Sequence, residues 1–232
     1  MKEAIVLAGG LGTRLRNITG VTPKSMVQIA GRPFLEYMLD YLLENNIEKV
    51  ILAVGYQGES IESYFRNEYK AIDIIYSYEE RPLGTGGAII NALALVESDN
   101  VFVLNGDSIF RVNLANLKKF HLEQGADITI SVKPLKNYDR YGTVVLDEKF
   151  KVIGFKEKVF TADGLINGGV YVVNKMKLVA MTFPESFSFE RELLESKLKD
   201  IGEYGYEVDA YFRDIGVPED YDKAQLEFKG FN

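Results

Sequence analysis

Short apolar runs alternate with helical patterns through the first half of the chain, and this alternation constrains the fold more than any other feature. The β-type runs are Ala4–Ala8, Lys49–Val54, Ile72–Tyr78 and Val101–Leu104. Between and after them, residues 34–42 and 89–96 carry apolar side chains at the spacing of a helix with one buried face. Strands that alternate with helices predict a mostly parallel sheet with helices on both faces, which is a Rossmann-like three-layer α/β sandwich.

The pattern changes near Ala126, where longer β-type runs replace the alternation. These runs are Asp127–Val132, Gly142–Leu146, Val152–Lys156 and Gly169–Val173. They predict that the sheet becomes mixed and is extended by a β-rich side. The chain of 232 residues shows no linker, repeat or low-complexity segment, and its length is near that at which a second core would begin. We therefore expect a single domain over residues 1–232, made of a half over about 1–125 and a half over about 126–232.

Composition excludes several classes of partner. The formal net charge is −7, from 27 basic and 34 acidic residues, whereas a surface for nucleic acid or anionic membrane needs a large basic patch. The absence of cysteine excludes disulfides and thiolate metal sites. The first residues lack a signal-peptide pattern and no apolar run reaches the length of a membrane span, so we expect a cytoplasmic protein.

The first apolar run leads directly into a glycine-rich segment, Gly9-Gly10-Leu11-Gly12-Thr13-Arg14-Leu15, and Pro23-Lys24 follows. Glycines let backbone N–H groups approach phosphate oxygens, and Arg14 and Lys24 add positive charge, so the segment predicts a nucleoside triphosphate site. It matches neither the Walker A pattern nor the dinucleotide fingerprint. The alternative is a glycine-rich turn with incidental basic residues. The residues that we assign to nucleotide binding here are Leu7, Ala8, Gly9, Gly10, Gly12 and Thr13.

Two aspartates follow β-type runs and suit a hard divalent cation. Asp107 ends the sequence Asn105-Gly106-Asp107 after an apolar run, where the alternative is an Asx turn that closes a strand. Asp214 precedes Ile215-Gly216-Val217-Pro218, which opens a helix, so it could instead serve as a helix-preceding cap.

Taken together, these motifs resemble the sugar-nucleotide pyrophosphorylases, nucleotidyltransferases that activate sugar 1-phosphates. The opening pattern of that family is similar to L-A-G-G-x-G-T-R-L, a short spacer and P-K. Further blocks follow in the family's order over nearly the whole chain: Gly31-Arg32-Pro33, Pro82-Leu83-Gly84-Thr85-Gly86-Gly87-Ala88, Asn105-Gly106-Asp107, Phe155-Lys156-Glu157-Lys158, Asn167-Gly168-Gly169 and Asp214-Ile215-Gly216-Val217-Pro218-Glu219-Asp220-Tyr221.

The resemblance implies that an oxygen of a sugar 1-phosphate attacks the α-phosphorus of a nucleoside triphosphate and that pyrophosphate leaves in line. Asp107 and Asp214 would hold Mg²⁺, while Arg14 and Lys24 would act as catalytic cations on the departing pyrophosphate and near the α-phosphate. The attacking group is already an oxyanion, so no protein nucleophile or general base is required. The single histidine, His121, lies in a Lys/Glu-flanked helical pattern and is expected at the surface.

The resemblance also assigns the half over about 1–125 to the nucleotide and the half over about 126–232 to the sugar. Lys158 would hold the sugar phosphate and Glu157 would accept hydrogen bonds from sugar hydroxyls. From the residues alone, Glu157-Lys158 would be interpreted as a solvated charge pair and Gly168-Gly169 as a strand kink. The sugar-phosphate residues that it implies are Asn105, Gly106, Glu157, Lys158, Asn167 and Gly168.

The resemblance implies that the segment Glu79–Ala88 recognises the base, and this segment looks like the guanylyl branch of the family. A carboxylate only accepts hydrogen bonds, so Glu79 matches the adjacent N1–H and N2–H₂ donors of guanine and mismatches the flanking carbonyls of uracil and thymine. Gly84 and Thr85, in a loop over residues 84–87, are assigned to the nucleotide. The implied substrates are GTP and a sugar 1-phosphate. A heptose 1-phosphate is the favoured acceptor, and the alternatives are mannose 1-phosphate or a uridylyl or thymidylyl transfer.

Several positions depart from the commonest family pattern: Arg16, Asn17, Ser25 and Arg32, where Arg32 replaces a lysine in the Gly-Lys-Pro element. Other functions share parts of the pattern. A molybdopterin guanylyltransferase would share the glycine loop, a metal-dependent glycosyltransferase would share an aspartate at a strand end, and a non-catalytic nucleotide-sugar sensor would bind without chemistry. The sequence leaves open whether the protein forms a homo-oligomer.

Overall fold

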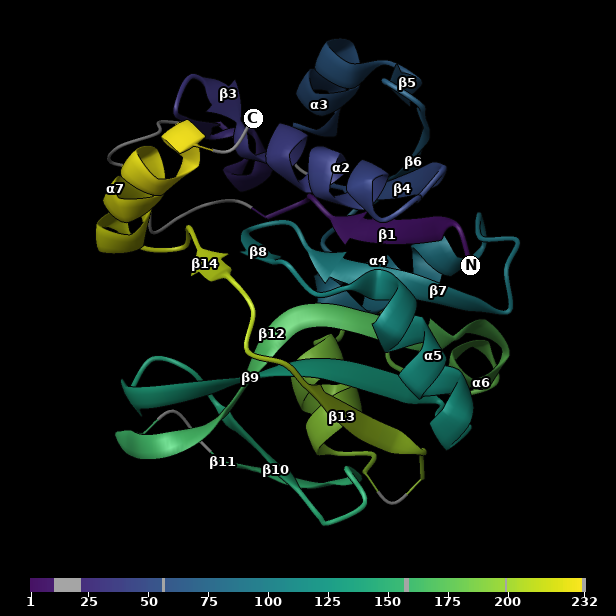
Figure 1. The fold of residues 1–232 in the computed structure, drawn as a ribbon. Coiled ribbons are helices and arrows are strands. Elements are labelled where there is room, and N and C mark those ends of the chain that lie inside the picture. The colour runs from purple at the N-terminus through teal and green to yellow at the C-terminus, as the bar shows by residue number, and fades with distance from the viewer. Residues whose placement is uncertain (11–21, 56, 157–158, 199, 231–232) are drawn as a thin grey trace.

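The central feature of the computed structural model, which describes residues 1–10, 22–55, 57–156, 159–198 and 200–230, is one twisted sheet. Ten of the described strands form it, in the order β11-β10-β12-β7-β1-β4-β6-β5, with β9 paired to β12 and β13 paired to β9. Figure 1 shows this sheet running through the middle of the molecule. The sheet continues from the first half of the chain into the second, because β12 pairs with β7.

Four parallel strands make the core of the sheet, as the alternating pattern predicts. They are β1 (Glu3–Leu7), β4 (Lys49–Val54), β6 (Ile72–Tyr78) and β7 (Asn100–Asn105). In β1 and β4 nearly every residue is buried, as expected for strands that are covered on both faces. Parallel pairing brings the carboxyl ends of β1, β4 and β7 to one edge of the sheet.

Helices cover both faces of the sheet and enclose two apolar cores (Figure 1). One core packs α2 (Phe34–Glu44), α3 (Gly58–Phe65), α5 (Leu114–Gln124) and the end of α7 (Pro218–Glu227). The other core packs α4 (Gly84–Leu93), α6 (Lys175–Val179) and the π-helical turn η3 (Phe189–Glu195). The predicted three-layer α/β fold with a mostly parallel sheet is thereby confirmed. In the described part of the chain, no helix is long and apolar enough to cross a membrane.

The second half adds the predicted β-rich side. Its strands are β9 (Ile128–Tyr138), β10 (Thr143–Leu146), β11 (Val152–Lys156), β12 (Thr161–Asn174) and β13 (Glu203–Glu207). The strand expected over Gly169–Val173 begins earlier, at Thr161, and its register against β9 shifts between Asn167 and Tyr171. Gly169 adopts a φ of 74° inside this shift, a left-handed conformation that glycine adopts most readily.

Short elements complete the chain. They are β2 (Gln28–Ile29), β3 (Arg32–Pro33), β5 (Glu68–Tyr69), β8 (Ser108–Phe110), β14 (Phe212–Asp214), η2 (Lys24–Met26) and η4 (Phe228–Gly230). Of these, β8 and β14 matter most for the chemistry, because they pair with each other across a long stretch of sequence.

His121 is buried, so the expectation of a surface position is wrong. It is 1% exposed, and its ring nitrogens lie 2.8 Å from Thr129 Oγ1 and 3.0 Å from Asn100 Oδ1. Burial lowers the pKa of His121 to about 4. The flanking Lys and Glu residues concealed its place on the buried face of α5, which it shares with Leu114 and Leu117. His121 therefore stays neutral near pH 7 and serves the fold.

Candidate active site

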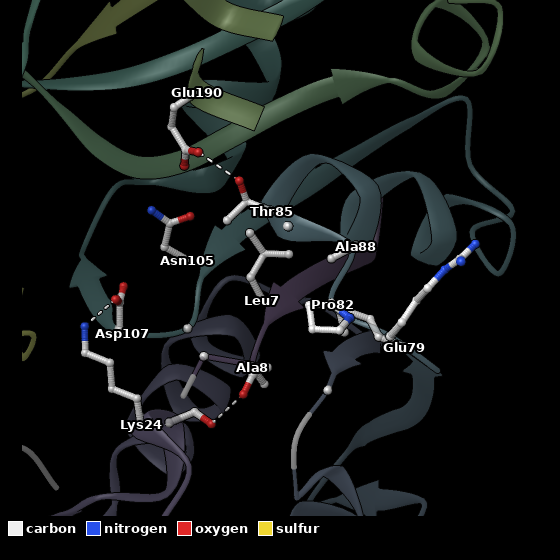
Figure 2. Close-up of a pocket in the computed structure, with 18 of the residues that line it drawn as sticks. Leu7, Ala8, Lys24, Glu79, Pro82, Thr85, Ala88, Asn105, Asp107 and Glu190 are labelled. Carbon is white, nitrogen blue, oxygen red and sulfur yellow. Dashed lines mark hydrogen bonds and ion pairs between the residues drawn. The ribbon is translucent and has the colours of Figure 1, made fainter. Parts of the chain in front are cut away.

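One large cavity, of about 940 Å³, opens at the carboxyl ends of β1, β4 and β7. This is the edge where open α/β sheets bind their ligands. The residues predicted from sequence that line the cavity are Leu7, Ala8, Gly9, Gly10, Lys24, Glu79, Gly84, Thr85, Asn105, Gly106 and Asp107. Figure 2 shows several of them around the cavity, including Glu79 on one side and Lys24 with Asp107 on the other. The structure thus gathers residues from separate motifs into one site.

Some predicted residues lie outside the described part of the chain: Gly12, Thr13, Arg14, Glu157 and Lys158. Other lining residues carried no role in the sequence assignment: Ser25, Ala53, Gly55, Glu80, Arg81, Pro82, Ala88 and Glu190. Most of these flank a recognised motif, so their positions follow from it. Glu190 is different, because a charged residue within the segment Phe189–Glu195 reads from sequence as part of a solvated helix face.

Gly106 is required for the close approach of two strand ends. Its N–H donates to the Leu7 carbonyl at 3.1 Å, which ties the loop after β7 to the end of β1. A Cβ at this position would lie 2.2 Å from the same carbonyl oxygen, a distance that no backbone atom tolerates without moving. The glycine therefore sets the position of Asp107, the next residue.

Gly106→Ala is expected to lower turnover by about tenfold or more, because displacement of Asp107 by a fraction of an ångström misaligns the site. Steady-state kinetics and thermal unfolding would check this expectation. Gly154→Ala is the matched control, since a Cβ there would meet no atom within 4 Å. Wild-type turnover in Gly106→Ala would show that the loop relaxes without moving Asp107.

Asp107 and Asp214 lie side by side, as a shared cation site requires. Antiparallel pairing of β14 with β8 puts Asp214 opposite Ser108, and Ile215 N–H donates to the Asp107 carbonyl at 3.0 Å. The Lys24 ammonium forms an ion pair with Asp107, and its Nζ lies 4.0 Å from Asp214 Oδ1. Figure 2 shows the Lys24–Asp107 contact. Both carboxylates thus converge on one position that already holds a positive charge.

This geometry fits a divalent cation that is only partly held by protein. Among the described residues, no group of three or more His, Cys, Asp and Glu side chains could enclose a metal ion. Mg²⁺ is commonly bound by one or two carboxylates, with its other ligands from water and substrate phosphates. Two convergent carboxylates beside an open cavity therefore suit that kind of site.

Lys24 is the cation that the described residues place closest to these carboxylates. Its side chain is 9% exposed, although it lines the cavity. The backbone N–H of Lys24 donates to the Gly10 carbonyl at 3.4 Å, so η2 lies directly against the glycine-rich segment. Lys24 thus connects the glycine-rich segment, through its backbone, with Asp107, through its ammonium.

Glu79 lies just beyond β6, at the opposite side of the cavity. Its Oε2 accepts a hydrogen bond from Leu83 N–H at 3.0 Å, and burial raises the pKa of its carboxyl. The remaining oxygen lone pairs can accept hydrogen bonds from a ligand. Glu79 is therefore held in place by the loop that follows it.

Residues 84–87 form the first turn of α4, which corrects the prediction of a loop. The N-terminal N–H groups of a helix lack intrahelical partners, and here Gly86 N–H donates to the Phe187 carbonyl at 3.0 Å. A Cβ on Gly84 would lie 2.5 Å from Phe187 O, and one on Gly86 would lie 2.1 Å from the Phe187 ring. These glycines therefore let the segment before η3 pack directly against the helix start.

Asn167 and Gly168 do not line the main cavity. The Asn167 amide donates to the Tyr171 hydroxyl at 2.9 Å, and its carbonyl accepts from Gly169 N–H at 2.9 Å. A Cβ on Gly168 would lie 2.2 Å from the Phe110 ring. Of the predicted sugar-phosphate residues that the structure describes, Asn105 and Gly106 reach the cavity, and Asn167 and Gly168 lie beside it in the β12 register shift.

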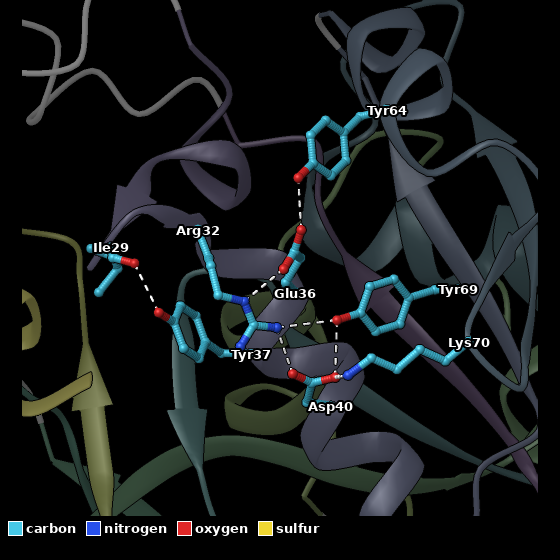
Figure 3. Close-up of polar contacts among 8 residues, drawn as sticks. All are labelled: Ile29, Arg32, Glu36, Tyr37, Asp40, Tyr64, Tyr69 and Lys70. Carbon is cyan, nitrogen blue, oxygen red and sulfur yellow. Dashed lines mark hydrogen bonds and ion pairs between the residues drawn. The ribbon is translucent and has the colours of Figure 1, made fainter. Parts of the chain in front are cut away.

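Arg32 is not among the residues that line the cavity. Its guanidinium forms ion pairs with Glu36 at 2.7 Å and Asp40 at 2.6 Å. It also donates to Tyr69 Oη at 3.2 Å and lies over the Tyr37 ring, 4.6 Å from the centroid. Figure 3 shows this network linking α2 to the strand β5. Arg32 thus joins α2 to β5 and, in this structure, serves the fold and not the cavity.

A model of the family described as nucleotidyl transferase matches residues 3–229. The chain is 46% identical to the D-glycero-α-D-manno-heptose 1-phosphate guanylyltransferase of Aneurinibacillus thermoaerophilus, over 99% of both proteins. It is 38% identical to the mannose-1-phosphate guanylyltransferase of Mycobacterium tuberculosis, over 94% of this chain and 62% of that protein.

The fold has a close counterpart among solved structures. The crystal structure of HddC from Yersinia pseudotuberculosis, complexed with GMP-PN, superimposes with a TM-score of 0.87. The two chains are 34% identical, over 98% of this chain and 100% of HddC. Because the family model spans nearly the whole sequence and the Aneurinibacillus protein is similar over 99% of this chain, the chain belongs to the nucleotidyl transferase family.

Proposed function

We propose that the protein transfers a guanylyl group from GTP to D-glycero-α-D-manno-heptose 1-phosphate, giving the GDP-sugar and pyrophosphate. The observation that carries this proposal is that one cavity is lined by the Glu79 carboxylate on one side and by Lys24 with Asp107 on the other. The 46% identity to a heptose 1-phosphate guanylyltransferase, over 99% of both proteins, supports a heptose 1-phosphate as the acceptor.

The chain's own residues would counter the repulsion between two anionic substrates. Backbone N–H groups of Gly9 and Gly10 and the Lys24 ammonium would bind phosphate oxygens near the α-phosphorus. Asp107 and Asp214 would hold Mg²⁺, which would supply the charge that neutralises the meeting phosphates. Since the sugar phosphate oxygen is itself the nucleophile, no residue needs to accept its proton.

The roles of five further residues are proposed from the resemblance. Arg14 would stabilise the departing pyrophosphate, and Gly12 with Thr13 would complete the phosphate loop. Lys158 would bind the phosphate of the sugar, and Glu157 its hydroxyls.

These roles divide the chain into a nucleotide-binding half, over about 1–125, and a sugar-binding half, over about 126–232. We place the enzyme in the cytoplasm, and its net charge of −7 argues against nucleic-acid or anionic-membrane partners. Whether two or more chains assemble is a separate question that size-exclusion chromatography with light scattering would answer.

The decisive experiment is pyrophosphate release from GTP with a panel of sugar 1-phosphates. The heptose 1-phosphate is expected to give the highest kcat/KM, and mannose 1-phosphate and glucose 1-phosphate are the competitors. Preference for mannose 1-phosphate would identify that sugar phosphate, and not the heptose 1-phosphate, as the acceptor. Absence of turnover with every sugar, together with tight GTP binding, would favour a non-catalytic sensor.

Glu79→Gln is expected to narrow the preference for GTP over UTP and dTTP. A hydrogen bond to a charged group is worth about 1.5 to 3 kcal/mol, so two of them predict a preference of about 100-fold or more in the wild-type protein. The amide of Gln presents NH₂ to a guanine donor but can pair with a uracil carbonyl. A panel of nucleotides at fixed sugar 1-phosphate would measure the change.

Glu80→Gln is the matched control for this prediction, because Glu80 is the adjacent carboxylate and lies exposed at the cavity. The nucleotide preference of Glu80→Gln should equal that of the wild type. If Glu80→Gln narrows the preference for GTP and Glu79→Gln does not, Glu80 is the residue that recognises the base. If the wild-type protein prefers UTP or dTTP, the guanylyl assignment fails while the nucleotidyl transferase family remains.

A further inference from the structure

Glu190 lines the cavity but has no part in the chemistry proposed above. Among the described lining residues, it is the one that comes from the chain beyond Asp107. It is half-buried at the start of η3, which packs against α4. The second half of the chain therefore contributes a carboxylate to the same space as Glu79 and Lys24.

The two oxygens of this carboxylate have different surroundings. Oε2 accepts hydrogen bonds from Thr85 Oγ1 at 2.9 Å and from Ser188 Oγ at 3.0 Å. Thr85 Oγ1 in turn accepts from Phe189 N–H at 2.8 Å, which fixes the threonine. In the described part of the chain, Oε1 has no hydrogen-bond partner. The carboxylate is thus held through one oxygen and offers the other.

Glu190 shares the cavity with Thr85 and Asn105, whose hydroxyl and amide groups can hydrogen-bond a polyol. Figure 2 shows Glu190 on the side of Thr85 and Asn105, away from Lys24 and from Glu79. Tyr171 is fully buried nearby, and burial, followed by the charge of Glu190, raises the pKa of its hydroxyl well above the usual range. Phosphate oxygens would be repelled by the carboxylate, and Glu79 already lies where a base would bind.

We infer that Glu190 is a specificity-determining residue whose Oε1 accepts a hydrogen bond from a substrate hydroxyl group. An ionised carboxylate accepts but cannot donate, so its partner must be a donor. The two sources of such a hydroxyl are the ribose of the nucleotide and the ring of the sugar 1-phosphate. The inference rests on the proposed function, since both sources belong to those substrates.

The test uses Glu190→Gln, which keeps an oxygen for Thr85 and Ser188 and replaces the free oxygen by a donor. Glu192→Gln is the matched control, because Glu192 is on the same helical turn, is exposed, and accepts from Ser188 N–H at 2.6 Å without lining the cavity. Each protein is assayed for kcat and KM with GTP, 2′-deoxy-GTP, 3′-deoxy-GTP and the sugar 1-phosphate. Calorimetric binding of the nucleotides and thermal unfolding are measured in parallel.

Glu190→Gln is expected to raise the KM of one substrate by about tenfold or more while kcat changes little, as for a lost charged hydrogen bond. If the ribose is the source, the wild type discriminates against one deoxynucleotide and Glu190→Gln does not. If the sugar is the source, neither the wild type nor Glu190→Gln discriminates among the three nucleotides in KM. The KM for the sugar 1-phosphate then rises in Glu190→Gln. Glu192→Gln should behave as the wild type in every assay.

Two results would overturn the inference. One is an unchanged KM for both substrates. The other is an equal rise in both KM values with a lowered unfolding temperature, which would show that Glu190 only fastens η3 to α4. Failure of the proposed function is seen separately, in the wild-type protein alone. If the wild type uses another nucleotide, its own deoxy analogues replace those of GTP, and if it does not turn over, calorimetric binding of the nucleotides and the sugar phosphate decides the role of Glu190.

Discussion

Asp107→Asn and Asp214→Asn are each expected to lower turnover by about 100-fold or more at saturating Mg²⁺, as loss of a preorganised electrostatic group typically does. Each substitution removes one of the two negative charges that converge beside Lys24. The isosteric amide preserves shape, so the loss reflects charge rather than packing. The apparent metal requirement should rise in both variants, because fewer charged oxygens remain to bind the cation.

The measurement is a metal titration of the steady-state rate, with Asp222→Asn as the control. Asp222 is an exposed carboxylate on α7, a few residues beyond Asp214, and does not line the cavity. Thermal unfolding of all three variants would separate catalysis from folding. Near wild-type rates at saturating Mg²⁺ in Asp107→Asn or Asp214→Asn would remove that aspartate from the proposed metal site.

The wild-type protein is expected to lose stability relative to Glu203→Gln as pH rises from about 5 to 8. Glu203 begins β13, is fully buried, and has no hydrogen-bond partner for either carboxylate oxygen among the described residues. Burial raises the pKa of Glu203 to about 8 from the usual 4.5. The folded protein therefore keeps a proton that the unfolded chain releases between these two values.

The sign follows from this proton difference. Stability falls with rising pH wherever the folded state binds more protons, at about 1.4 kcal/mol per pH unit for one group. The stability of the wild type relative to Glu203→Gln should therefore decline by about 4 kcal/mol between pH 5 and 8.

Urea unfolding at several pH values would measure this difference. His121, whose pKa is lowered to about 4 by burial, acts in the opposite direction between pH 4 and 6.5, because it stays neutral in the fold. Since both proteins contain His121, its effect cancels in the comparison. A difference that does not depend on pH would mean that Glu203 is already ionised in the folded protein.

The parallel core of the sheet could be predicted closely from sequence. The strands at Lys49–Val54 and Ile72–Tyr78 have the predicted bounds, and the first strand differs by one residue at each end. Buried parallel strands are continuous apolar runs, so the local sequence is sufficient to locate them. The strand Glu203–Glu207 escaped prediction, because alternating tyrosine, glycine and glutamate carry little apolar signal.

The sequence by itself determined which motifs the chain carries and the edge of the sheet where they lie. It also showed that a glycine-rich loop and acidic groups occur together. Only the tertiary structure decided which distant residues meet. Antiparallel pairing of β8 with β14 brings Asp214 to Asp107, and packing of η3 on α4 brings Glu190 to Thr85. Burial of His121 and Glu203 was likewise invisible, since charge and local spacing alone favour the surface for such residues. Periodicity reports the local conformation of a segment, whereas these contacts depend on how segments far apart in sequence pack together, which the chain encodes only through the whole core.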